Sequence, residues 1–150
     1  MLEPRIRPWL AADMLLAAAF VQPGPSAADT AVSQPVARQK VIFHVGDADP
    51  AKWTVALNNV FNAHKDPGAE NVDIEVVAIG AGIRMPKLES PEGGRIAEAV
   101  RGGIKVVACE NSMQGQRVTR EDVLPGIGYV PAGVVELMQR QREGYAHIRP

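Results

Sequence analysis

The sequence predicts an α/β fold with a mainly parallel sheet of about five strands. Short apolar runs rich in β-branched residues alternate along the chain with segments of helical periodicity. The apolar runs are nearly continuous, which is typical of parallel strands that helices cover on both faces. Because strands and helices follow one another in this order, we expect a flavodoxin-like domain with three layers.

The first strand is predicted over residues 41–45, and a helix follows the turn after it. Asp49 is the expected N-cap of that helix, with Pro50 at its first position. The helix has one apolar face, formed by Trp53, Leu57, Val60, Phe61 and His64. The second strand is predicted over residues 72–79.

The middle of the chain is predicted to hold a short helix and the third strand. Residues 83–91 are ambiguous and contain at most one irregular helical turn. The helix covers residues 92–101, and its inward side chains are Ile96, Ala97 and Val100. The third strand covers residues 104–108 and runs directly into a polar turn at residues 109–113.

The last part of the chain is predicted to add a capped turn, a strand, a helix and an edge strand. Thr119 and Asp122 have the spacing of a capping box. A brief strand is expected over residues 128–130, and residues 145–149 alternate as an edge strand does. The helix between them covers residues 132–143, and the side chains on its shared face are Val134, Leu137, Met138 and Gln141.

The composition excludes several classes of function. A chain of 150 residues is long enough for one domain with a sizeable core. Its net charge of −1 gives no electrostatic reason to expect binding to nucleic acid. A single cysteine excludes an internal disulfide, and the three histidines lie far apart in the sequence, so we expect no metal site. No nucleotide-binding glycine motif follows the first strand, and we expect no cofactor.

Residues 1–28 have the features of a signal peptide. Arg5 and Arg7 give a basic start, residues 14–21 are apolar, and small residues precede a cleavage site after Ala28. The apolar run is too short to span a bilayer. We therefore expect a periplasmic protein with a polar leader at residues 29–39, a domain at residues 40–150 and no membrane association after processing. The alternative is an N-terminal extension that is not a signal, in which case the protein is cytoplasmic.

Cys109 is the main functional candidate, because it follows the third strand directly. Ligands and chemistry in open α/β sheets collect beyond the carboxyl ends of the strands. A reactive thiolate needs groups that stabilise its negative charge, and the amides of the polar turn could supply them. Glu110, Asn111 and Met113 in that turn complete the first candidate set. The alternative is a small buried side chain, as free cysteines often are.

Three residues outside the turn are supporting candidates. His44 lies near the end of the first strand and could act as a general base near Cys109, although a histidine inside an apolar strand is more often a core residue. Asn58 and Asn59 lie off the apolar face of the first helix. They could orient a ligand or donate hydrogen bonds to a thiolate, and a solvated surface or a subunit contact explains them equally well.

Four segments within residues 40–150 form a recognisable combination. They are Phe43-His44-Val45-x-Asp47-x-Asp49, Trp53-x-x-Ala56-Leu57-Asn58-Asn59, Ala108-Cys109-x-Asn111-x-Met113 and Leu124-Pro-Gly-Ile-Gly-Tyr-Val-Pro-Ala-Gly-Val-Val-Glu-Leu-Met138. Together they resemble the DsrE/DsrF-like family in its small single-domain branch.

The resemblance implies a function for Cys109. In the sulfur-relay members a strand-end cysteine accepts and passes on persulfide sulfur, and Cys109 occupies the matching position. It also implies a homo-oligomer, a trimer or a multiple of it, with the cysteine near a subunit boundary. We therefore expect a sulfurtransferase-like carrier that binds or transfers sulfane sulfur, with a sulfur donor or acceptor protein as partner. Two alternatives stay open: a module that binds a small ligand, and an oligomeric scaffold with a structural Cys109.

Overall fold

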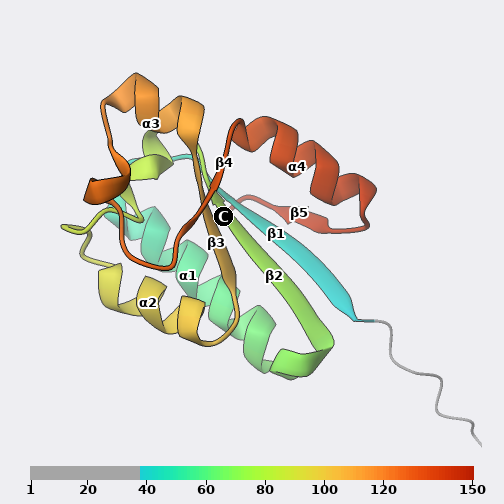
Figure 1. Ribbon diagram of the computed structural model, residues 1–150. Helices are drawn as coiled ribbons and strands as arrows, with labels where there is room; N and C mark the ends of the chain where they lie inside the picture. Colours follow the sequence, from blue (N-terminus) through green and yellow to red (C-terminus); the bar gives the residue numbers. More distant parts are fainter. Residues whose placement is uncertain (1–37) are drawn as a thin grey trace, which may run out of the picture. The chain divides into compact units, whose positions relative to one another are not determined.

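The computed structural model describes residues 38–150, which form one five-stranded sheet with helices on both faces (Figure 1). The strands are all parallel and lie in the order β4-β3-β2-β1-β5. This confirms the predicted α/β, flavodoxin-like fold. The predicted signal peptide, residues 1–28, and nearly all of the predicted leader lie outside the described residues.

The first strand and helix form as their patterns predict. Strand β1 covers Gln39–Val45 and helix α1 covers Pro50–Lys65. The Asp49 side chain accepts a hydrogen bond from the Ala51 N–H at 2.9 Å, which satisfies one of the free amides at the helix start. The buried residues of α1 are Trp53, Ala56, Leu57 and Val60. Strand β2, Val72–Ala78, then pairs with β1.

The segment between β2 and β3 differs from its prediction in detail. A 3₁₀ helix, η2, covers Gly80–Arg84, earlier than the irregular turn predicted within residues 83–91. Helix α2 covers Gly93–Arg101 and buries Ile96 and Ala99. Ala97, predicted to face inward, is only half-buried because it lies beside the face that contacts the sheet. Strand β3 covers Lys105–Cys109.

The predicted polar turn after β3 is wrong, because the chain enters helix α3, Glu110–Gln116, with Cys109 as its N-cap residue. Asparagine, serine and glycine in this segment are weak helix formers. Tertiary contacts compensate: the Ser112 hydroxyl accepts a hydrogen bond from the Gly80 N–H at 2.8 Å, and Met113 is buried in the core. Beyond α3, the predicted capping box of Thr119 and Asp122 is confirmed in the 3₁₀ helix η3, Arg120–Asp122.

The chain then crosses to the other face of the sheet. Strand β4, Gly128–Val130, pairs with β3, helix α4 covers Gly133–Arg142, and strand β5, Ala146–Ile148, pairs with β1 at the opposite edge. No helix within residues 38–150 combines the length and the apolar character that crossing a membrane requires.

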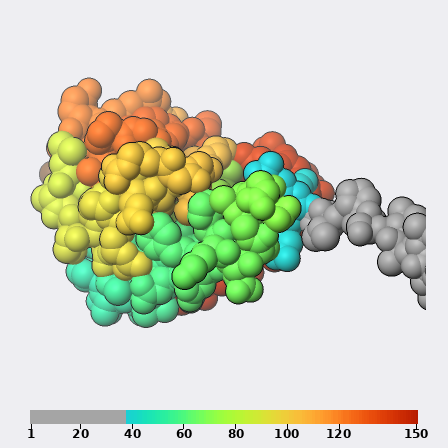
Figure 2. Space-filling view, turned by 90° about the horizontal axis from the view of Figure 1, so that it is seen from below, coloured from blue at the N-terminus to red at the C-terminus, as the bar shows by residue number. Residues whose placement is uncertain are grey.

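The two faces of the sheet have cores of very different size. The face under α1 and α2 has a core of 21 buried residues, and these two helical segments lie side by side in the view from below (Figure 2). The core under α4 consists of Ile42, Val77, Val107, Val130 and Leu137. The predicted apolar face of α4 is therefore wrong in part: Val134 is 60% exposed and Met138 is 56% exposed. Glu136 and Arg140 occupy inward positions instead, where they pair with Lys105 and Glu75 of the sheet.

Candidate functional site

Cys109 lies beside the point where the chain, after β4, changes from one face of the sheet to the other. It ends β3, and its neighbour across the sheet is Val130 at the end of β4. The chain after β3 enters α3, whose Met113 belongs to the larger core, whereas the chain after β4 enters α4 on the other face. Such a switch point between neighbouring parallel strands is the usual ligand site of open α/β sheets.

The sulfur atom of Cys109 receives a hydrogen bond from the start of α4. The backbone N–H of Gly133, the first residue of the helix, donates to Sγ at 3.2 Å. The amides at a helix start carry partial positive charge and favour an anion there. The site therefore contains a donor suited to a thiolate at Cys109.

The surroundings of Cys109 favour the thiolate. Burial alone raises the pKa of the thiol, but hydrogen bonds from the Ser112 side chain and from the backbone of Gly133, Ser112 and Asn111 outweigh burial. The net effect lowers the pKa of Cys109 below its ordinary value of 9.0. Since Ser112 Oγ accepts from Gly80, its own proton is free to be donated to sulfur. A larger fraction of the thiol is therefore ionised at neutral pH than in a free cysteine.

The thiol is also covered, since Cys109 is only 3% exposed. Gly133 lies against it, and a Cβ atom at position 133 would lie 2.4 Å from Ile79 Cγ1 and 3.2 Å from Cys109 Cβ. Only glycine lets α4 approach the sheet this closely. Gly133 was not among the predicted site residues; a glycine near the start of the helix predicted over residues 132–143 was the signal that could have indicated a close backbone approach.

The other candidates in residues 109–113 serve mainly to hold the local structure. Asn111 is exposed, and its backbone N–H donates to the Pro131 carbonyl at 3.2 Å, which links the segments after β3 and β4. Glu110 pairs with Arg120, and Met113 is buried in the larger core.

His44 and Cys109 lie on non-adjacent strands. Strand β2 runs between β1 and β3, so the two residues are separated by about 10 Å across the sheet. The His44 ring instead stacks on His147 of the edge strand β5, with ring centroids 5.6 Å apart. Our expectation that neighbouring strand ends bring His44 to Cys109 is therefore corrected by the strand order.

Asn58 and Asn59 belong to the opposite face of the sheet from the sulfur atom. Both lie on α1, which packs on the larger core, whereas Cys109 Sγ faces the start of α4. Asn58 is exposed and accepts a hydrogen bond from Arg95 Nη2 at 2.7 Å, which links α1 to α2. Asn59 is half-buried. Within residues 38–150, no three histidine, cysteine or acidic side chains gather closely enough to hold a metal ion.

Comparison with known proteins identifies the family. The family model described as the DsrE/DsrF-like family matches residues 39–150. The chain belongs to the DsrE/DsrF-like family. No curated protein matches this DsrE/DsrF-like chain.

Solved structures agree with this DsrE/DsrF-like assignment. The protein of unknown function MTH1491 from Methanobacterium thermoautotrophicum is 33% identical, with a TM-score of 0.71 over 75% of this chain and 99% of that chain. The ychN protein from E. coli is 12% identical, with a TM-score of 0.64 over 75% of this chain and 99% of that chain. The protein of unknown function BT1422 from Bacteroides thetaiotaomicron is 14% identical, with a TM-score of 0.60 over 77% of this chain and 97% of that chain. The last two likenesses concern the fold alone.

Proposed function

We propose that this DsrE/DsrF-like protein binds and transfers sulfane sulfur as a persulfide on Cys109. The observation that carries the proposal is the 3.2 Å hydrogen bond from the Gly133 N–H to Cys109 Sγ at the switch point of the sheet. The lowered pKa of the thiol supports it, because the thiolate is the reactive form.

The proposed step is an exchange between two sulfur compounds. The Cys109 thiolate attacks the terminal sulfur of a donor persulfide, R–S–SH, and forms the new sulfur–sulfur bond of Cys–S–SH. The donor's sulfur–sulfur bond breaks, and its electron pair leaves with R–S⁻. One sulfur atom is transferred, charge is conserved, and no outside oxidant or reductant is needed.

Intact mass spectrometry tests the proposal. We expect the protein incubated with glutathione persulfide to gain the mass of one sulfur atom, and a thiol reductant to remove it. Because Cys109 is the only cysteine in the chain, the Cys109→Ala variant is a complete control. Absence of added sulfur on the native protein, or equal addition to the variant, would contradict the proposal.

We further propose that the protein works as a homo-oligomer, a trimer or a multiple of it, in the periplasm, with a donor or acceptor protein as partner. The exposed apolar side chains of α4, Val134, Val135 and Met138, support association between subunits. The basic start, apolar run and small residues of residues 1–28 support export. Intact mass spectrometry of the protein recovered from the periplasm tests export. We expect the mass of a chain that has lost residues 1–28 by cleavage after Ala28.

A specific feature also favours the second candidate function, binding of a small ligand. A cleft of about 440 Å³ lies among the segments that follow β1, β2 and β3, and Trp53, Arg84, Lys87 and Gln116 line it. Glu89 also lines the cleft and pairs with Lys87, so Arg84 is the cationic side chain that favours an anion. In a thermal-shift screen of phosphate and small carboxylates, stabilisation that persists in Cys109→Ser would favour this function. Absence of any stabilisation would count against it.

A further inference from the structure

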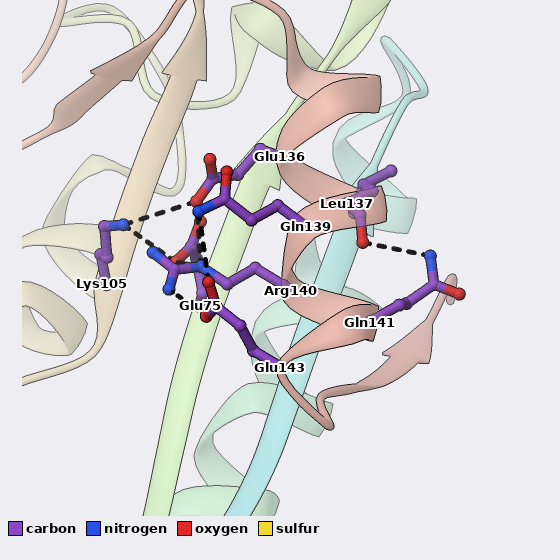
Figure 3. Close-up of polar contacts among 8 residues, drawn as sticks. All are labelled: Glu75, Lys105, Glu136, Leu137, Gln139, Arg140, Gln141 and Glu143. Carbon is purple, nitrogen blue, oxygen red and sulfur yellow. Dashed lines mark hydrogen bonds and ion pairs between the residues drawn. The ribbon is translucent and has the colours of Figure 1, made fainter.

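Helix α4 lies over a cluster of charged side chains on the sheet (Figure 3). Glu75 of β2 is only 2% exposed, and its Oε2 atom lies 2.9 Å from Arg140 Nε and 3.0 Å from Lys105 Nζ. Arg140 Nε also lies 2.9 Å from Glu136 Oε1, and Arg140 Nη1 lies 2.8 Å from Glu143 Oε2. Arg140 thus connects the helix to the buried carboxylate of the sheet.

Stability alone does not explain a buried ion cluster at this place. The second carboxylate oxygen of Glu75, Oε1, is buried and has no hydrogen-bond partner among the described residues. Leaving a buried acceptor unpaired is costly, and apolar side chains of similar volume often stabilise such a site as well or better. A role in fixing geometry is the better explanation, as it is for buried polar groups that determine register elsewhere.

The geometry that the cluster could fix is the position of α4 along β2. Gly133, Leu137 and Arg140 share one face of the helix, at offsets of four and seven residues. On β2, alternate residues share a face, so Glu75 lies on the same face as Ile79. Gly133 lies against Ile79 and Arg140 pairs with Glu75, so the helix runs antiparallel to the strand and is held at both ends.

We infer that Glu75 and Arg140 are positioning residues for Cys109. Their ion pair holds α4 in the register at which the Gly133 N–H reaches Cys109 Sγ. Leu137 is the only large apolar side chain of α4 buried in the small core, so apolar packing contributes little to the position of this helix. The importance of this positioning for sulfur chemistry rests on the function proposed above, whereas the positioning itself does not.

Titration of the thiol in charge-matched variants tests the inference. The rate of iodoacetamide alkylation across pH gives the apparent pKa of Cys109. In the double variant Glu75→Met/Arg140→Met, we expect this pKa to rise by about half a unit to one unit, the effect of weakening one hydrogen bond to the thiolate. This variant removes one negative and one positive charge, so a change in net charge cannot cause the shift.

A second variant separates positioning from direct electrostatics. Glu75→Gln removes a negative charge, which by itself would lower the pKa of a nearby thiol, whereas loss of positioning would raise it. Glu92→Gln is the matched control, because Glu92 is also buried and paired, with Arg95, but lies at the N-cap of α2, which packs on the other face of the sheet. We expect the pKa of Cys109 to be raised in Glu75→Gln and not to be raised in Glu92→Gln.

An NMR readout keeps the inference falsifiable if one variant folds poorly. In the native protein, the Gly133 amide resonance should shift as Cys109 titrates, and in a folded Glu75→Gln variant this shift should be lost or halved. An unchanged thiol pKa together with an unchanged Gly133 titration in either folded variant would overturn the inference. Persulfide formation is measured separately, so a native protein that shows the positioning effect but accepts no sulfur would refute only the proposed function.

Discussion

At the scale of single residues, Cys109 combines two features with opposite effects on its chemistry. Burial limits access and favours the neutral thiol, whereas donors from Gly133 and Ser112 favour the thiolate. The hydrogen bonds have the larger combined effect on the pKa, while Gly133 lies against the buried thiol. Gly133 therefore matters for both features.

Substitution of Gly133 is therefore expected to change both stability and the thiol. In Gly133→Ala, the new Cβ atom would lie 2.4 Å from Ile79 Cγ1, so α4 must move away from the sheet. We expect a loss of about 1–3 kcal/mol in the free energy of unfolding, as for other overpacked sites. The pKa of Cys109 should rise, and alkylation should become faster at high pH.

Gly94→Ala is the matched control for this prediction. Gly94 also lies in a helix, α2, but an added Cβ atom there meets nothing within 4 Å. We expect this variant to be neutral or more stable by up to about 1 kcal/mol, with an unchanged thiol. Equal behaviour of the two alanine variants would contradict the role assigned to Gly133.

His44 gives the stability of the protein a dependence on pH. Burial, then the charge of Arg149, then His147 lower the pKa of His44 below its ordinary value of 6.5, against an opposing effect of Asp47. The unfolded chain therefore binds this proton at a higher pH than the folded protein does. As the pH falls through about 6.5, the free energy of unfolding decreases, because protonation favours the unfolded chain.

Urea denaturation measures this effect. Between about pH 7.5 and about pH 5.5, we expect His44→Asn to lose less stability than the native protein. His64→Asn is the control, because His64 is also half-buried but lies on α1, away from the stacked pair of His44 and His147. The same loss of stability in native protein and His44→Asn would refute the assignment.

At the scale of elements, α4 is held by few apolar contacts and by several charges. Gly133 and Leu137 are its buried residues, and the ion cluster around Glu75 lies beneath its second half. Helix α1, in contrast, buries four side chains in the larger core. The two helices therefore depend on different interactions for their position, and equivalent substitutions in them should have different consequences.

Two leucine substitutions compare the helices directly. Leu57→Ala on α1 and Leu137→Ala on α4 each remove a buried side chain, and such changes cost about 2–5 kcal/mol. We expect Leu57→Ala to lie near the upper end and Leu137→Ala near the lower end, because the thin layer under α4 can relax into the space. Only Leu137→Ala should raise the pKa of Cys109; a shift in both variants would indicate general loosening instead.

At the scale of the whole molecule, the outward face of α4 is expected to contact another subunit. Val134 is 60% exposed, Val135 53% and Met138 56%, which is unusual for three apolar side chains on one short helix. We expect Val134→Lys/Met138→Lys to shift the oligomer toward monomer in analytical ultracentrifugation, since burying unpaired charge at an interface is costly. The stability of the isolated subunit should change little, because both side chains are already exposed.

Val55→Lys is the control for the interface. Val55 is 50% exposed on α1, which lies on the other face of the sheet. This variant should keep the oligomer of the native protein. A native protein that is monomeric at all concentrations would contradict the expected assembly.

The sequence by itself determined the order and type of most elements, the fold class and the family. Apolar runs, helical spacing and caps such as Asp49 are local signals, and each needs only neighbours in the chain to be recognised. Cys109 at the end of β3 could be predicted for the same reason.

The tertiary structure decided what surrounds that cysteine. Helix α3 forms in a segment of weak helix formers because Ser112 and Met113 make contacts with distant parts of the chain. The strand order separates His44 from Cys109, and the charges beneath α4 turn Val134 and Met138 outward. Gly133 donates to a sulfur atom 24 residues away, a contact that no local pattern contains, because it exists only once β3 and α4 lie together on the sheet.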